Sequence, residues 1–217
     1  MKRLLSLLAI LPLLLSLAAC GSSFGKTYRV FTLTATDAPV NVEKIDALLT
    51  EEGSGYAKIK EQNPAILSTL SNVTPAELAG KCEIYKFMQN NRTSLAGRTF
   101  LVCGEKVYSI GNSGYNGVKE IACYTDILYY IYDGGFGLLR STVGSVNIKT
   151  GERHYAQPDD FCNTEVAFLP SEDGKTLGFC RATFTEIGAD SYEVNIQRGD
   201  VIFDSVEKIT FFKSIAG

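Results

Sequence analysis

The sequence predicts an α+β fold that is dominated by β-structure, with short helices near the N-terminus followed by antiparallel sheet. Helix-capping residues are concentrated in residues 27–80, whereas residues 81–217 alternate between strand-like runs and turns rich in Gly, Asn and Asp. Closely spaced runs pair through tight hairpins, which makes the sheet antiparallel. We expect a sandwich or a strongly bent single sheet. A partial propeller-like arrangement fits less well, because no repeat is visible along the chain.

The first part of the folded region mixes one strand with helices. Residues 27–36 are rich in β-branched and aromatic residues, which predicts a strand. Asn41 is expected to cap a helix that carries one apolar stripe and ends at Gly53. Asn63-Pro64 predicts the start of a second short helix, and residues 74–77 form a capping box for a third.

Strand-like runs dominate from residue 82 onward. They cover residues 82–88, 98–103, 106–110, 118–124, 126–132, 136–149, 164–169, 176–184, 191–197 and 201–213. Turn signals such as Asp173-Gly174 and Gly199-Asp200 separate them. Apolar and polar residues alternate at 192–197, which predicts one buried and one solvated face, while residues 127–132 are apolar enough to be buried on both faces.

The N-terminal segment has the layout of a secretory signal. Lys2 and Arg3 precede an apolar run at residues 4–17, and small residues lead to Cys20. The run is about 14 residues long, shorter than the roughly 20 needed to cross a bilayer, so it does not predict a spanning helix. Residues 17–20, Leu-Ala-Ala-Cys, resemble the lipobox of bacterial lipoproteins.

Resemblance to bacterial lipoproteins implies a lipid anchor on Cys20. It implies cleavage before this cysteine, diacylglycerol on its sulfur and a further acyl chain, such as palmitate, on the new amino terminus. At about 0.8 kcal/mol per buried CH₂, two or three chains hold a protein on its membrane. Gly21, in place of Asp, implies sorting to the outer membrane of a diderm host. We therefore expect a signal peptide at 1–19, a lipidated tether at 20–26 and a single globular domain at 27–217.

The charge balance indicates that nucleic acid is not a partner. Removing the 19-residue signal from the 217 residues leaves 198, with 19 basic and 24 acidic side chains. A net charge near −5 repels a polyanion, and no basic run or basic helix face is present. Membrane attachment must therefore come from the lipid, and a chain of this length fits one compact domain.

Five cysteines remain once Cys20 carries the lipid. They are Cys82, Cys103, Cys123, Cys162 and Cys180. An exported protein pairs its cysteines where geometry allows, and an odd number leaves one free. Cys82 and Cys103 flank a hairpin loop near residues 91–92, and Cys162 and Cys180 flank a turn at 171–174, so both pairs are candidate disulfides.

A second pairing of the first three cysteines remains open. Cys103 and Cys123 also lie symmetrically about residues 112–114, so Cys103 has two candidate partners. If Cys82 pairs with Cys103, Cys123 is the candidate free thiol. Its place in the apolar stretch 121–124 predicts a buried and inert side chain.

Two short motifs match elements of the penicillin-interacting serine enzymes, but their context argues against that activity. Residues 23–26 read S-x-x-K and residues 149–151 read K-T-G. In that family the serine opens a buried helix, whereas Ser23 lies in the tether three residues after Cys20. We interpret Lys149–Gly151 as the turn of a hairpin.

Metal and cysteine chemistry also find little support. His154 is the single histidine, which excludes a histidine-based metal site, and no C-x-x-C pair is present. A dyad of His154 with Cys123 would need a thiol of lowered pKa, but apolar surroundings raise the pKa of a thiol. We expect His154 to be a solvated residue next to a turn.

The remaining motifs are better explained as turns and surface. Gly135-Phe136-Gly137 lacks the third glycine of a dinucleotide fingerprint, and Arg198-Gly199-Asp200 falls where a turn is expected between two strands. Asp159-Asp160 and Glu165 are expected to be hydrated acidic residues rather than calcium ligands. No catalytic, cofactor-binding or metal-binding residue is predicted, and no cofactor.

These observations favour a non-enzymatic envelope lipoprotein. We expect it on the outer membrane, facing the periplasm, as a binding or accessory factor for a protein partner. One alternative is a periplasmic hydrolase or redox protein that uses a free cysteine. Another is an adhesin or inhibitor exposed on the cell surface.

Overall fold

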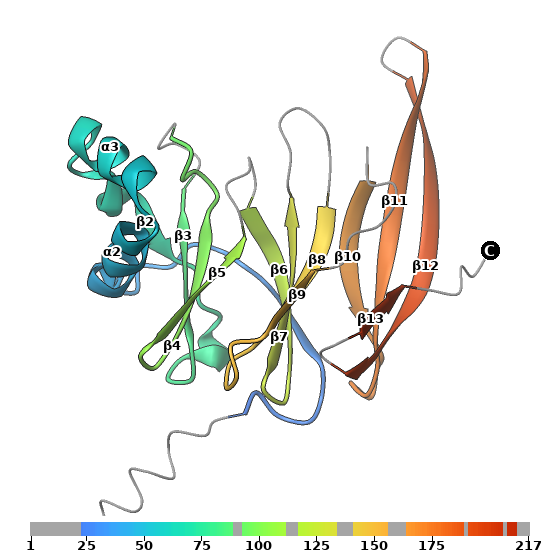
Figure 1. Cartoon of the computed structure of the whole chain (residues 1–217). Coiled ribbons are helices and arrows are strands. Elements are labelled where there is room, and N and C mark those ends of the chain that lie inside the picture. The colour runs from blue at the N-terminus through green and yellow to red at the C-terminus, as the bar shows by residue number, and fades with distance from the viewer. Residues whose placement is uncertain are drawn as a thin grey trace, which may run out of the picture.

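The described strands form three antiparallel sheets arranged in series, with helices at one end of the series (Figure 1). The computed structural model describes residues 23–88, 93–111, 117–133, 141–155, 164–188, 191–205 and 208–211. Within these ranges the predicted α+β fold, β-dominated with short helices near the N-terminus, is confirmed.

In the residues that the structure describes, two α-helices and two single 3₁₀ turns make up the helical part. The α-helices are α2 (Val42–Glu51) and α3 (Ser54–Gln62), and the 3₁₀ turns are η2 (Ile66–Thr69) and η3 (Ala76–Leu78). α2 lies where the sequence predicts it, although the Asn41 side chain makes no capping hydrogen bond. α3 has no counterpart among the expected elements, because its sequence opens with Ser-Gly and carries no clear apolar stripe.

The helices expected after Asn63 and Thr74 are only the single turns η2 and η3. The first of these turns is followed directly by β2 (Leu70–Asn72), which pairs with β3 (Glu83–Phe87). A single helical turn does not gain enough hydrogen bonds to offset nucleation, so pairing with the sheet decides the conformation here.

The first sheet carries the helices on one face. Its order is β2-β3-β4-β5, with β4 at Thr99–Cys103 and β5 at Lys106–Gly111. Ile45 and Leu49 of α2 are fully buried and belong to the same cluster as Tyr85 and Phe100 of the sheet. Figure 1 shows α2 and α3 beside this sheet, away from the other two.

The middle sheet is buried on both faces. Its order is β1-β6-β7-β8-β9, and its strands are Arg29–Thr32, Gly117–Tyr124, Ile127–Asp133, Ser141–Asn147 and Arg153–Tyr155. Ile121 and Leu128 pack with Ile84 and Leu101 of the first sheet. On the opposite face, Tyr129 and its neighbours pack against the third sheet. Burial on both faces agrees with the apolar character of residues 127–132.

The third sheet has the order β10-β11-β12-β13. Its strands are Thr164–Pro170, Leu177–Gly188, Ser191–Ser205 and Lys208–Phe211. Phe168 and Leu177 are buried against the middle sheet. The described strands therefore form three layers, rather than the two of a sandwich. Apart from β1, each layer contains four strands that follow one another in the chain, as in a propeller blade.

The prediction of a turn at Arg198-Gly199-Asp200 is wrong. β12 continues through this segment, with Gly199 opposite Phe179 and Asp200 opposite Gly178 on β11. A Gly-Asp pair makes a hairpin only when the flanking strands pair with each other. Here the residues on both sides pair with β11 in one unbroken register, so the backbone stays extended.

The folded domain begins at an earlier residue of the N-terminal segment than expected. Phe24 is only 6% exposed, and its N–H donates to the carbonyl oxygen of Thr125 at 2.5 Å. The Thr125 N–H donates to the carbonyl oxygen of Gly25 at 2.6 Å. Phe24 and Gly25 thus belong to the domain, although their composition places them in a flexible tether.

Candidate binding surfaces

Several predicted site residues lie outside the described residues. Cys20 is one of them, so its lipidation remains a prediction. Cys162 is another, so its pairing with Cys180, which lies on β11 opposite Ala167, also remains one. Asp159-Asp160 and residues 135–137 likewise fall outside, while Glu165 lies on β10 opposite Ala182.

A disulfide joins Cys82 and Cys103, the pairing that the hairpin spacing predicts. Glu83 of β3 pairs with Val102 of β4. Cys82 is the residue before Glu83 and Cys103 is the residue after Val102, and the Cα atoms of the two cysteines are 4.4 Å apart. Cys123 is unbonded and 2% exposed, and burial raises the pKa of its thiol to about 12. A neutral, inaccessible thiol is not a nucleophile.

His154 is too far from Cys123 to form a catalytic dyad with it. His154 lies on β9, Cys123 lies on β6, and β7 and β8 separate these strands. Three strand spacings of about 4.8 Å place the two backbones about 14 Å apart. The structure therefore does not assemble the dyad.

Lys149–Gly151 forms the predicted hairpin turn between β8 and β9. The Asn147 side chain accepts hydrogen bonds from the N–H groups of Lys149 and Thr150, at 2.9 and 3.2 Å, and Gly151 has a positive φ of 82°. Lys149 also forms an ion pair with Asp126 at 2.9 Å. These contacts give the segment a structural role, and Ser23 is an exposed residue outside any helix.

Within the described ranges, no three His, Cys, Asp or Glu side chains gather as metal ligands would. No helix in these ranges has the length and apolar character needed to cross a bilayer.

A concave site lies between α3 and the segment before β4, and we call it the cap pocket. Its volume is about 330 Å³. It is lined by Glu52, Gly55, Tyr56, Ile59, Ser94, Leu95 and Arg98. Arg98 Nη2 donates to Glu52 Oε1 at 2.5 Å, and the guanidinium lies 5.2 Å from the centre of the Phe100 ring. Neither charged group is a motif residue, so the sequence gives no signal for this site.

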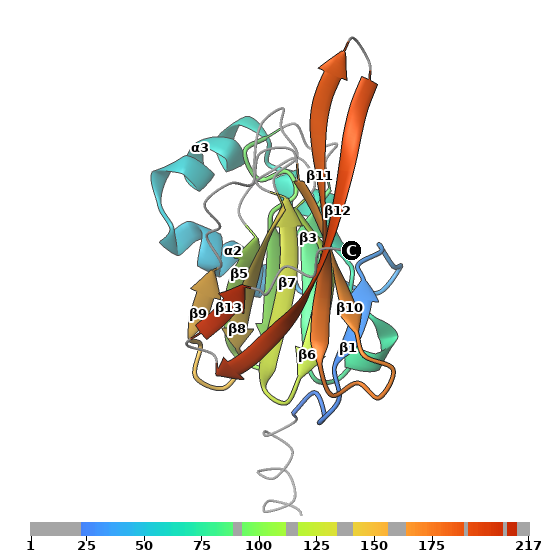
Figure 2. The same cartoon turned by 90° about the vertical axis from the view of Figure 1, so that its right-hand side faces the viewer.

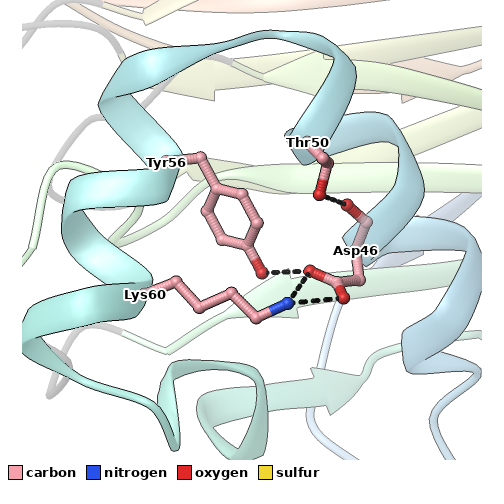
Figure 3. A network of polar contacts seen from close by, with 4 residues as sticks. All are labelled: Asp46, Thr50, Tyr56 and Lys60. Atoms are coloured by element: carbon pink, nitrogen blue, oxygen red, sulfur yellow. Dashed lines mark hydrogen bonds and ion pairs between the residues drawn. The ribbon is translucent and has the colours of Figure 1, made fainter.

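A polar network holds the helical wall of the cap pocket in place (Figure 3). Asp46 of α2 accepts hydrogen bonds from the Tyr56 hydroxyl at 2.5 Å and from Lys60 Nζ at 2.7 Å, both on α3. The hydrogen bond from Lys60, followed by that from Tyr56, lowers the pKa of the Asp46 carboxyl. Burial and the contact with Asp46 raise the pKa of the Tyr56 hydroxyl. The network fixes α3 against α2.

A second candidate surface is the end of the β11–β12 hairpin. We call Phe184–Gly188 of β11 and Ser191–Val194 of β12 the distal ribbon. β10 pairs with β11 only through Leu177–Thr183, and β13 pairs with β12 only through residues 201–205. Among the described strands, those of the distal ribbon pair only with each other. Figures 1 and 2 show the ribbon extending beyond the other strands.

Comparison of the chain with protein-family models, with curated proteins and with solved structures found no match.

Proposed function

We propose that this protein is a lipid-anchored lipoprotein of the bacterial envelope, held on the outer membrane and facing the periplasm. It acts as a non-enzymatic binding or accessory factor for a protein partner. The observation that carries the proposal is the distal ribbon, which stands out from the three sheets (Figures 1 and 2).

The backbone edges of the distal ribbon support a role in binding protein. On the outer side of each ribbon strand, no described strand pairs with residues 184–188 or 191–194. An unpaired edge presents a row of N–H and C=O groups that readily pairs with an extended segment of another chain. Proteins that do not use such an edge usually shorten or cover it.

The position of the ribbon relative to the expected anchor supports the same proposal. The described chain begins at Ser23, three residues after Cys20, and the ribbon lies at the opposite end of the molecule (Figures 1 and 2). A lipid on Cys20 would keep the Ser23 end at the membrane. The ribbon would then point into the compartment, where a partner can reach it.

The alternative of a cysteine-dependent enzyme is disfavoured by the burial and raised pKa of Cys123. An adhesin or inhibitor would use the same ribbon on the outer side of the membrane. Protease treatment of intact cells separates these orientations, because an inward-facing domain is protected. Cleavage of the domain in intact cells would overturn the periplasmic orientation.

Photo-cross-linking from the ribbon tests the proposal. A photoreactive amino acid replaces Thr185 in one variant and Tyr192 in another, and growing cells are irradiated before purification. We expect both variants to give one discrete adduct with the same partner. The control places the probe at Lys175, in the exposed β10–β11 turn at the opposite end, where no adduct is expected.

A shortened ribbon provides the matched variant. Thr183 and Asn195 are register partners, so an Asn-Gly turn between them can replace residues 184–194 and close a two-residue hairpin. The pairing with β10 and β13 is retained. We expect an unchanged melting temperature and loss of the co-purified partner. Partner recovery equal to that of the natural chain, or absence of any ribbon adduct, would count against the proposed function.

A further inference from the structure

We propose that the cap pocket is a second binding site, and that it takes a peptide segment presenting an apolar side chain next to a main-chain amide. The pocket lies at the helical end of the series of sheets, whereas the distal ribbon belongs to the sheet at the other end (Figure 1). The inference therefore does not depend on the ribbon.

The polar groups of the pocket match an amide. Arg98 uses Nη2 for Glu52 and uses Nε and Nη2 for the Ser109 hydroxyl, at 3.4 and 3.5 Å. In the described part of the chain, Arg98 Nη1 and Glu52 Oε2 have no partner. The pair thus offers one donor and one acceptor side by side. An amide accepts from the first and donates to the second.

Charged ligands fit the Arg98–Glu52 pair less well than an amide does. A carboxylate could accept from Arg98, but it would lie beside the Glu52 carboxylate. An ammonium group could donate to Glu52, but it would lie beside the guanidinium. Like charges at contact distance are unfavourable, so a neutral group with both a donor and an acceptor is selected.

The remaining lining accounts for the apolar side chain. Tyr56, Ile59 and Leu95 are the aromatic and aliphatic residues of the lining. A volume of about 330 Å³ is near the lower limit for small-molecule sites. It accommodates one side chain with its flanking amide rather than a larger ligand.

Contacts within the protein hold the side chains of the site in place. Asp46 fixes the Tyr56 hydroxyl (Figure 3), while Glu52, Ser109 and the Phe100 ring fix the Arg98 guanidinium. Side chains that are held before binding lose little conformational entropy when the ligand enters. This arrangement favours recognition of a single residue by a small pocket.

Titration with a small amide tests the proposal directly. The probe is N-acetyl-L-leucinamide, added to the purified mature protein in detergent, with binding followed by NMR shifts. We expect saturable binding. N-acetylglycinamide, which lacks the apolar side chain, and N-acetyl-L-leucine, which carries a carboxylate, should each bind at least about tenfold more weakly.

Two blocking variants and one control locate the site. Gly55→Leu projects a side chain from α3, where a Cβ atom meets nothing within 4 Å, and Ser94→Phe fills the pocket from the other side. Both should abolish probe binding. Ala57→Leu, on an exposed position of the same helix and outside the lining, should bind the probe as the natural chain does. Melting curves establish that each variant is folded.

The natural ligand is then identified in the envelope. A photoreactive residue at Ser94 that yields a protein adduct indicates a partner chain as the source. A low-mass peptide released from the purified protein by acid indicates a free peptide. The proposal is overturned if neither is recovered, if N-acetyl-L-leucinamide does not bind, or if Gly55→Leu binds it as well as Ala57→Leu.

Discussion

The three cysteines of the described core differ in chemistry although they belong to one cluster. Cys82 and Cys103 are bonded to each other, and Cys123 is a thiol on the neighbouring sheet. Burial raises the pKa of the Cys123 thiol to about 12, so almost none of it is thiolate at neutral pH. Its position is that of a small apolar core residue rather than of a reactive group.

Thiol labelling checks the state of Cys123. In the folded protein at pH 8 without reductant, we expect alkylation of this residue to be at least about 100-fold slower than in urea, because the thiol is both neutral and inaccessible. Peptide mapping by mass spectrometry follows the label. Equal rates in the two conditions would contradict the buried position and would revive the cysteine-dependent alternative.

The same experiment tests the second candidate disulfide. If Cys162 and Cys180 are bonded, the denatured and unreduced mature protein labels at Cys123 alone. Label at all three residues would show that the second pair is not formed.

Asp46 makes the stability of the folded protein depend on pH in the acidic range. Hydrogen bonds from Lys60 and then Tyr56 hold the pKa of its carboxyl below the ordinary range. A group with a lowered folded-state pKa stabilises the fold above its unfolded pKa of about 3.9, and this stabilisation is lost as the pH falls through the folded pKa. Both side chains of the ion pair are partly exposed, which limits its contribution to about 1 kcal/mol.

Asp46→Asn therefore lowers the free energy of unfolding at pH 7 by about 1 kcal/mol or less. The difference from the natural chain persists down to about pH 4 and then shrinks toward zero as Asp46 is protonated. Urea unfolding measured from pH 7 to pH 2 follows this difference. A difference that grows in acid would contradict the assigned role.

At the scale of elements, the two glycines that bracket the start of α3 have opposite roles. Gly53 precedes the helix with φ 106° and ψ −152°, a conformation that is essentially restricted to glycine. Gly55 lies inside the helix. At neither position would an added Cβ meet an atom within 4 Å, so only the backbone distinguishes them.

Alanine substitution separates the two roles. Gly55→Ala is expected to raise the free energy of unfolding by about 0.5 kcal/mol, because alanine favours the helix. Gly53→Ala should lower it by about 1–3 kcal/mol, because the backbone would be strained. Thermal or urea unfolding of both variants measures the effect. A change of the same sign in both would contradict the assigned helix start.

The elements that could be predicted from sequence are those with local signals. Strands such as β3, β4 and β7 are apolar runs between turn residues, and their hairpins place Cys82 opposite Cys103. The expected break at Gly199 fails because its conformation depends on β11, which is distant from it in the sequence. The helix expected after Asn63 fails for a similar reason, since Leu70–Asn72 pair with β3 in place of continuing the helix.

The candidate sites were harder to predict than the strands. Glu52 and Arg98 are 46 residues apart and belong to no motif, so only the fold brings them together. The distal ribbon is visible in the sequence as two strands, but its projection depends on where β10 and β13 stop pairing. A site that forms only through tertiary packing has no local sequence pattern from which it can be predicted.

The expected lipid determines which end of the whole molecule would lie at the membrane. Phe24 is packed on the β6–β7 turn, and Cys20 lies four residues before it, which allows a span of at most about 14 Å. A lipid on Cys20 would therefore hold this turn close to the bilayer. The distal ribbon would then face away from the membrane, since it lies at the opposite end (Figure 2).

The premise of the proposed function is lipid on Cys20, and mass spectrometry of the protein isolated from cell membranes tests it most directly. We predict a chain that lacks residues 1–19 and begins at a Cys20 carrying diacylglyceryl and acyl groups, while a Cys20→Ala variant is neither cleaved at this site nor lipidated. Recovery of the natural chain with an unmodified Cys20, or with residues 1–19 still attached, would contradict the account.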